Sequence, residues 1–171
     1  MVLDEVMLSL TTLEARTRTL PLNDLPLPLF SGYSYSDAEL LNLRRFRDLV
    51  ADHDLLILAS PEYHGAASGS LKNALDHLAE GSLRGKVVGL VGVAGGSVSP
   101  VATTTQLRSV VRVLGGVASP CELLVTRSKH IFDEAGNVTD AQVVERIGMF
   151  SEQLLMLSGQ LAPAPTDFVS P

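Results

Sequence analysis

The sequence has no tryptophan, a single cysteine and few aromatic residues of any kind. One cysteine, Cys121, can form neither an intrachain disulfide nor the thiol pair that a redox or zinc site needs, so a reducing cytoplasm is expected. Aromatic residues are 5% of the chain, which leaves few rings to stack on nucleic-acid bases. No apolar run approaches the roughly 20 residues that a membrane-spanning helix needs. Asp4 and Glu5 make the start too acidic for a secretory signal.

Basic residues are also scarce, since 13 lysines and arginines stand against 19 acidic residues, for a net charge of −6. This charge argues against binding to nucleic acid or to anionic membranes, and we expect neither partner. With 171 residues, 46% of them apolar, the chain can bury the core of one globular domain. We expect that domain to span residues 1–171, with a loose, proline-rich tail from about residue 162.

The sequence does contain a regular alternation of helical and strand patterns. Apolar residues at helical spacing, with capping boxes at Ser36–Glu39 and Thr139–Gln142, predict helices, and continuous apolar runs predict buried strands. The expected helices are 2–15, 36–51, 68–79, 100–114 and 139–157, and the expected strands are 17–22, 55–59, 86–94 and 117–126. Strands that are apolar on both faces and alternate with helices indicate an α/β fold, with a parallel sheet covered on both sides.

Two turns follow neighbouring strands of this expected sheet. Ser60-Pro-Glu-Tyr-His-Gly65 brings a ring, a carboxylate and an imidazole directly after one strand, and Gly95-Gly96 follow the next. The carboxyl ends of parallel strands share an edge, and ligands bind there. Glycines at such a place permit positive φ and a close approach of backbone N–H groups to a planar ligand. Each turn taken singly is equally well read as a loop that only shapes the chain, but side by side they favour a ligand cleft.

Four segments share their pattern with a known family: Pro61–Gly65, Ser68–Asp76, Gly95-Gly96 and Gln106–Arg108. They resemble the NAD(P)H-dependent FMN reductases, a family that includes quinone and chromate reductases. The resemblance covers roughly Val2 to Gly159, and its most specific part is Pro-Glu-Tyr followed by Leu-Lys-Asn-Ala-Leu-Asp. It implies a flavodoxin-like, three-layer α/β/α fold with a parallel sheet in the strand order 2-1-3-4-5.

The resemblance also implies which residues meet the cofactor. The first turn would lie along the isoalloxazine ring of FMN, and the second would meet its pyrimidine end. This assigns Pro61, Glu62, Tyr63, His64, Gly65, Gly95, Gly96 and Ser97 to cofactor binding. The family usually has Asn where His64 stands and Pro-Gly where Ser68-Gly69 stand, differences that bear on ring contacts and substrate access. No catalytic side chain and no metal site are expected, because the flavin itself carries the chemistry.

The start of the chain departs from the family pattern. The family opens with an apolar strand and a Gly-Ser-x-Arg-type loop that holds the FMN phosphate, and neither precedes the first expected helix. That strand is central in the 2-1-3-4-5 order, so the expected strand 17–22 lacks a neighbour and the edge of 55–59 is unpaired. We expect about 30 further residues upstream of Met1, from the size of a strand–loop unit. A remodelled sheet, or a strand from another subunit, is the alternative. Phosphate binding is assigned to no residue.

The expected function is electron transfer from NADPH or NADH through bound FMN to a small-molecule acceptor. That acceptor is a quinone, a free flavin, an azo compound or a metal oxyanion. The alternative is a non-catalytic family member that acts as an oligomerising or regulatory protein. Under both hypotheses we expect a homodimer or homotetramer, as in the family, with the helix 68–79 in the contact through Leu71 and Leu75. Lys72 and Asp76 either pair or serve that contact, and His77 is expected at a solvated helix end.

Overall fold

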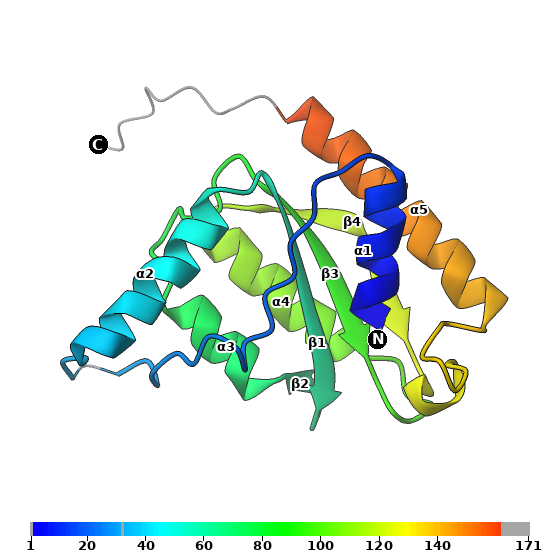
Figure 1. Ribbon diagram of the computed structural model, residues 1–171, viewed down its shortest axis with the longest axis horizontal. Coiled ribbons are helices and arrows are strands. Elements are labelled where there is room, and N and C mark those ends of the chain that lie inside the picture. Colours follow the sequence, from blue (N-terminus) through cyan, green and yellow to red (C-terminus); the bar gives the residue numbers. More distant parts are fainter. Residues whose placement is uncertain (1, 32, 162–171) are drawn as a thin grey trace.

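The computed structural model describes residues 2–31 and 33–161, and the expected loose tail from residue 162 lies outside them. The described chain alternates helices and strands as the sequence predicts (Figure 1). The helices are α1 (Val2–Thr12), α2 (Asp37–Ala51), α3 (Gly69–Asp76), α4 (Val101–Val113), the short 3₁₀ helix η1 (Ser128–His130) and α5 (Ala141–Gln160). The strands are β1 (Leu55–Tyr63), β2 (Ala66–Ala67), β3 (Val87–Val93) and β4 (Val117–Val125).

The strands form one sheet in the order β2-β1-β3-β4. β1, β3 and β4 run parallel, with Pro61 opposite Val93 and Val93 opposite Val125 at their carboxyl ends. β2 is a two-residue antiparallel addition to the end of β1. The register of β4 against β3 shifts between Ala118 and Glu122, around Pro120.

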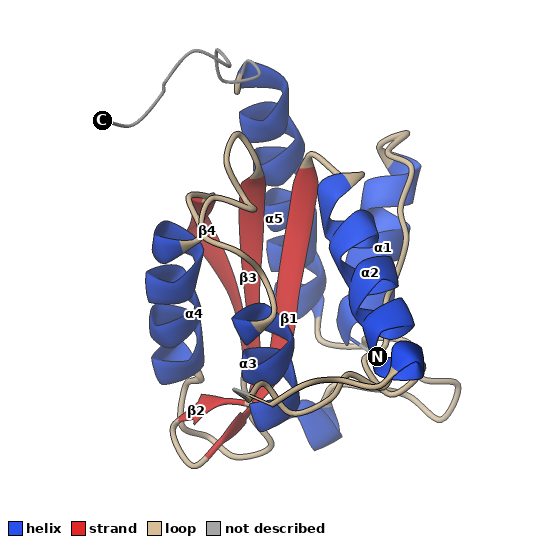
Figure 2. Ribbon diagram, turned by 90° about the vertical axis from the view of Figure 1, so that its left-hand side faces the viewer, coloured by secondary structure: helices blue, strands red, loops and turns tan. Residues whose placement is uncertain are grey.

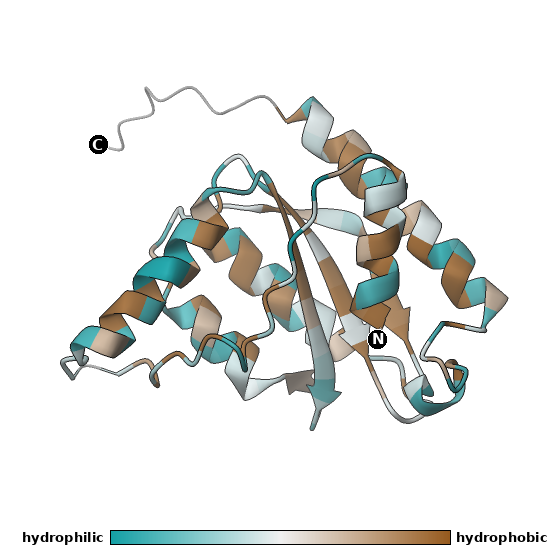
Figure 3. Cartoon of the chain, in the orientation of Figure 1, coloured by the Kyte–Doolittle hydropathy of each residue, from teal (hydrophilic) through white to brown (hydrophobic). Residues whose placement is uncertain are grey.

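Helices cover both faces of the sheet, as the predicted α/β architecture requires (Figure 2). Leu55, Ile57 and Ala59 of β1 pack with the side chains of α1 and α5, whereas Leu56 and Leu58 pack with those of α3 and α4. α2 joins the second layer through Phe46, which packs with Ala74 of α3. The apolar residues of Figure 3 gather accordingly on the strands and on the helix faces that meet them. Among the described residues, no helix combines the length and the apolar character needed to cross a bilayer.

Helix caps fix where several of these elements begin. The Ser36–Glu39 capping box is confirmed. The Ser36 hydroxyl accepts a hydrogen bond from Glu39 N–H, and the Glu39 carboxylate accepts one from Ser36 N–H. The box expected at Thr139 is wrong. Asp140 is the N-cap of α5 and accepts from the N–H groups of Gln142 and Val143, whereas the Thr139 hydroxyl donates to the carbonyl of Ile131. A carboxylate one residue later satisfies the same free backbone donors.

The expected strand 17–22 is also wrong, since these residues form no strand. A strand needs a neighbour for its backbone groups, and Pro21 lacks an N–H to offer one. The link between α1 and α2 instead crosses between the helical layers on the β1 side of the sheet (Figures 1 and 2). The unpaired edge expected for 55–59 is confirmed. Among the described residues, β1 pairs along 55–61 with β3 alone, and Leu55 to Ala59 are only half-buried.

Helix α3 faces the core where a subunit contact was expected. Leu71 and Leu75 are 9% and 3% exposed and pack in the cluster beneath α4, so neither can serve a contact. His77 is 2% exposed instead of solvated, because its Nε2–H donates to the carbonyl of Pro28 at 2.8 Å and the ring of Phe30 packs edge-on against it. The outward side of α3 carries Lys72 and Asp76, which form an ion pair with 2.5 Å between Nζ and Oδ1.

Gly89 in the middle of β3 provides a test of how closely α5 packs on the sheet. A Cβ at this position would lie 2.7 Å from Cδ1 of Leu154 and 2.8 Å from Cζ of Phe150. We expect Gly89→Ala to lower the free energy of unfolding by about 1–3 kcal/mol, the usual cost of overfilling a packed core. Gly148→Ala is the control, since a Cβ there meets nothing within 4 Å and alanine favours a helix. Urea unfolding would measure both, and equal stability of the two variants would contradict this packing.

Candidate functional site

The first turn is the tip of a tight hairpin. β1 and β2 pair through Glu62 with Ala67 and Tyr63 with Ala66, which leaves a two-residue loop of His64 and Gly65. Both loop residues have positive φ, 54° and 76°, as the hairpin turns that match strand twist require. Glycine adopts this conformation freely, and histidine is among the residues that tolerate it. The tip is open to solvent, with the Tyr63 side chain 61% exposed.

Helix α4 holds this hairpin in place. The Glu62 carboxylate accepts from the backbone N–H and from the hydroxyl of Thr103, at 3.2 Å each, and Thr103 is fully buried. One turn further along α4, the side-chain carbonyl of Gln106 accepts from the N–H of Ala67 at 2.9 Å. Because a carboxylate at the first turn of a helix satisfies free N–H groups and favours the helix dipole, Glu62 acts as a cap for α4. Its side chain is thereby committed to the fold.

The second turn, Gly95 to Ser97, lies beside the first. Pro61 and Val93 are opposite each other in the parallel ladder, so the residues that follow them leave the sheet together at one edge. Gly95, Gly96 and Ser97 are exposed, and none of their N–H groups donates to another described group. A Cβ on either glycine would meet nothing within 4 Å. Gly95 and Gly96 do not adopt the positive φ that glycine permits, so their contribution is the open space and the free backbone donors.

A third turn at the same edge was not singled out from the sequence. It follows β4 and includes Arg127, Lys129 and His130, all exposed. Arg127 N–H donates to the carbonyl of Gly96 at 2.8 Å, and Ser128 N–H donates to that of Ala94 at 3.1 Å. The sequence could have indicated this turn, because β4 is the third parallel strand in succession and ligands bind at the carboxyl ends of such strands.

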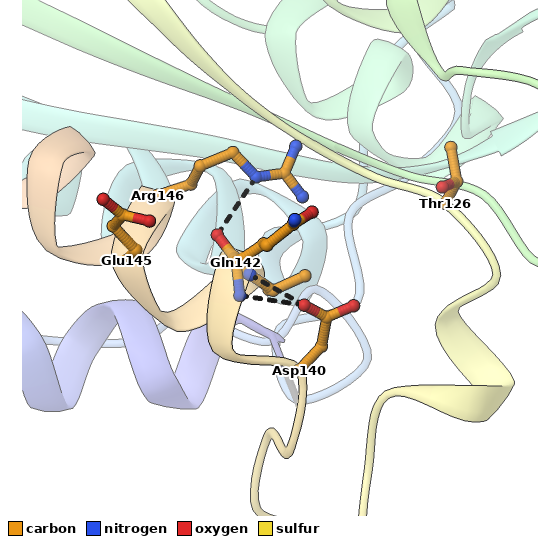
Figure 4. A pocket seen from close by; sticks show the side chains of 6 residues that line it. Thr126, Asp140, Gln142, Glu145 and Arg146 are labelled. Carbon is orange, nitrogen blue, oxygen red and sulfur yellow. Dashed lines mark hydrogen bonds between the residues drawn. The ribbon is translucent and has the colours of Figure 1, made fainter.

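A separate hollow of about 520 Å³ lies at the start of α5 (Figure 4). Its lining residues are Thr126, Asp140, Gln142, Val143, Glu145 and Arg146. Asp140 caps the helix, and the Arg146 guanidinium donates to the carbonyls of Gln142 and Leu124. These charged groups already serve the fold, so we assign the hollow no ligand. In the described chain, no group of three or more histidine, cysteine or acidic residues is placed to hold a metal ion.

Comparison with known proteins decides the family. Residues 1–130 match the sequence profile of the NADPH-dependent FMN reductases. The chain belongs to this family. It is 38% identical over 138 residues to FMN-dependent NADPH-azoreductases of Staphylococcus aureus (strain USA300) and Staphylococcus haemolyticus (strain JCSC1435), a match that covers 79% of this chain and 71% of each relative. These relatives are enzymes, and the predicted membership of an enzyme family is confirmed.

Solved structures with low sequence identity confirm the flavodoxin-like fold. The flavoenzyme NAD(P)H:(acceptor) oxidoreductase FerB from Paracoccus denitrificans superposes with a TM-score of 0.72 at 20% identity, over 94% of this chain and 89% of that one. A flavodoxin from Streptococcus pneumonia TIGR4 gives 0.59 at 17% identity, over 91% and 88%. At these identities the likeness concerns the fold alone. The order β1-β3-β4 corresponds to the 3-4-5 portion of the expected 2-1-3-4-5 sheet.

The eight residues predicted to meet a cofactor do not all have the same role. Tyr63, His64, Gly65, Gly95, Gly96 and Ser97 are exposed in the two adjacent turns, and Pro61 is exposed at the end of the ladder. Glu62 differs, because its carboxylate turns back onto α4. The structure therefore brings the predicted residues to one rim and separates an anchoring residue from those that face outward.

The Glu62 anchor can be tested by a double-mutant cycle with Thr103. Glu62→Ala removes the acceptor and should lower the free energy of unfolding by about 1 kcal/mol, the typical loss of a helix cap. Thr103→Val removes only the hydroxyl and keeps the volume. If the two side chains act together, we expect a coupling energy of about 0.5–1 kcal/mol in chemical unfolding. Strictly additive effects would show that the contact contributes nothing, and Thr103→Ser, which keeps the hydroxyl, is the matched control.

Proposed function

We propose that this chain is an FMN-dependent oxidoreductase that takes electrons from NADPH or NADH and delivers them to a small-molecule acceptor. The observation that supports it most is the pair of adjacent turns at the carboxyl rim, with free N–H groups on one and an exposed ring on the other. The names of the relatives agree with this activity. The acceptor is a quinone, a free flavin, an azo compound or a metal oxyanion, and the azo compound has the added support of the relatives' names.

The residues of the two turns suit a flat heterocycle. Tyr63 offers an exposed aromatic face, and a ring stacked on it would gain about 0.5–1.5 kcal/mol beyond its buried area. The open backbone of Gly95 and Gly96 allows a ligand to approach closely, and the free N–H groups up to Ser97 can donate to its carbonyl oxygens. We assign Pro61, His64 and Gly65 to the same contact surface, with Glu62 as the residue that positions it.

The cofactor carries the reaction, and the chain binds and orients it. When held by these turns, FMN would supply the two-electron transfer between the nicotinamide and the acceptor. For a quinone the balance closes with two electrons and two protons, one proton from the hydride and one from solvent. The backbone donors of Gly95 to Ser97 would orient the ring, and the hairpin of Tyr63 would shield one side of it from water. No side chain is assigned a catalytic role.

The competing proposal is a non-catalytic protein with an oligomerising or regulatory role. It is favoured by one observation. Each of α2, α4 and α5 has a carboxylate at its start, from Glu39, Glu62 and Asp140, so these helix starts offer no phosphate site. Flavin binding by the purified chain separates the two proposals, since a regulatory scaffold has no need of a ring site.

Flavin binding can be tested with a pair of tyrosine variants. We expect the purified chain to quench flavin fluorescence, and Tyr63→Ala to weaken the affinity by about tenfold through lost stacking. Tyr33→Ala is the control, because Tyr33 is 85% exposed and lies outside the two turns. Gly96→Val should weaken binding without unfolding the chain, since its Cβ enters open space. A chain that binds no flavin while fully folded would overturn the proposed function.

We further propose that the chain forms a homodimer or homotetramer through the outward side of α3. Leu71 and Leu75 are excluded by their burial, which leaves the half-exposed Lys72 and Asp76 as the charged groups of the contact. Lys72→Glu should lower the mass measured by analytical ultracentrifugation. Arg45→Glu on exposed α2 makes the same charge change elsewhere and should leave the mass unchanged. An unaltered mass for Lys72→Glu would remove α3 from the contact.

The location and extent of the protein remain proposals as well. The lone, half-buried Cys121 is consistent with a reducing compartment, and we propose the cytoplasm. Over residues 2–31 and 33–161, the helices and strands share one sheet and one set of packed layers, which supports the proposal of a single domain over residues 1–171.

A further inference from the structure

We propose that Arg127 and Lys129, in the turn after β4, bind a phosphate group of the nucleotide used at this site. The inference rests on the proposed function, because it names a contact of the same rim. It concerns a turn that carries none of the eight residues assigned to the cofactor from the sequence. The ligand chemistry is a phosphate ester or pyrophosphate, supplied by the flavin or by the nicotinamide nucleotide.

The position of the turn is fixed against the proposed ring site. Arg127 N–H donates to the carbonyl of Gly96, so the arginine backbone lies one hydrogen bond from the glycine assigned to the ring. Ser128 N–H donates to Ala94, and His130 N–H closes the turn on Arg127. A ligand seated beside Gly96 would therefore extend its substituents within reach of a long arginine or lysine side chain.

The charges at the rim are unevenly divided among its turns. Neither Pro61–Gly65 nor Gly95–Pro100 contains a lysine or an arginine, whereas the turn after β4 contains both. Arg127 and Lys129 are exposed, and neither side chain forms a hydrogen bond or ion pair with any described residue. Two exposed acidic residues follow, Asp133 and Glu134, and Asp133 is engaged by Asn137, whose side-chain hydrogen bond lowers the pKa of that carboxyl.

The rest of the rim is unfavourable to a phosphate. Glu5 lies in the first turn of α1, which begins at the same end of the sheet (Figure 1). Glu62 places a second carboxylate at the start of α4. In a chain of net charge −6, a phosphate at this rim needs local positive charge, and the Arg127–Lys129 turn provides it.

Arg127 also occupies a conformation that favours glycine. Its φ is 50°, in the left-handed region that few non-glycine residues adopt. A glycine would fit this backbone with less strain, so the side chain is not required for the turn itself. Arg127→Gly consequently separates a structural role in the turn from phosphate binding. The variant relaxes the backbone, and it removes the guanidinium that would bind the phosphate.

The experiment compares the full chain with two double variants. Arg127→Gly/Lys129→Gln removes the proposed phosphate contacts, and Arg44→Gln/Arg45→Gln removes two exposed charges from α2 as the matched control. Affinity for FMN and riboflavin is measured by fluorescence quenching, and KM is measured for NADPH and NADH. Calorimetric titration with 2′,5′-ADP, which carries phosphates and no redox group, gives a reading independent of activity. Thermal unfolding should show that the first variant is at least as stable as the control.

The source of the phosphate determines which measurement changes. Loss of a flavin phosphate contact lowers FMN affinity by about tenfold, towards that of riboflavin, which stays unchanged. Loss of a 2′-phosphate contact raises KM for NADPH alone and weakens 2′,5′-ADP, whereas loss of a pyrophosphate contact raises KM for both nicotinamide nucleotides. The inference is overturned if the first variant matches the control in all three measurements.

Failure of the proposed function would look different. A folded wild-type chain that takes up neither flavin would contradict it, and the titration with 2′,5′-ADP would then decide the inference alone. Binding that disappears in the Arg127→Gly/Lys129→Gln variant would support a phosphate site. Absence of such binding would reject it.

Discussion

The parallel pairing of β1 with β3 is the constraint on which the rest of the site depends. Seven successive residue pairs, from Leu55 with Val87 to Pro61 with Val93, fix where both strands end. Leu55, Ile57 and Ala59 pack with α1 and α5, and Leu56 and Leu58 pack with α3 and α4, so the fit of these side chains to both helical layers favours this register. The turns that follow must then leave the sheet side by side. The position of the proposed ring site therefore follows from packing in the core, away from the site itself.

Helix α4 holds the hairpin that follows β1 and part of β4 in place by hydrogen bonds. Glu62 and Ala67, on the two sides of the hairpin, are bonded to Thr103 and Gln106, one turn apart on the same helix. On the same helix, Thr104 and Arg108 donate hydrogen bonds to the Glu122 carboxylate of β4. One helix is thus tied by polar contacts to the hairpin and to β4, and by burial to the sheet. Ligand-contacting residues are held best by elements whose own side chains are already committed.

The sequence predicts most of this arrangement, and its errors have physical causes. Apolar patterns find α2, β3 and β4 closely, because those patterns report burial directly, but they end β1 at Ala59 although the strand continues to Tyr63 through the polar residues of the hairpin. They misplace the role of Leu71 and Leu75, since periodicity shows that a helix has an apolar face but does not tell a core from a subunit contact. They miss the burial of His77 because the residues that cover it, Pro28 and Phe30, lie more than 40 positions earlier. The contact of Glu62 with Thr103 is missed for the same reason, because the two residues are 41 positions apart.

The turns and charges at the carboxyl rim determine which parts of a nucleotide these residues can recognise. The adjacent turns offer a ring surface and backbone donors, features that suit a flat neutral heterocycle. Glu5 and Glu62 place negative charge at the starts of α1 and α4, which opposes a phosphate near them, whereas Arg127 and Lys129 supply positive charge in the turn that is hydrogen-bonded to Gly96. Ring and phosphate recognition would then come from different strands, β1 and β3 for the ring and β4 for the charge. Among the described residues, β1 along 55–61 and β4 each pair with β3 alone, so the ring and phosphate contacts would come from strands held by the same partner.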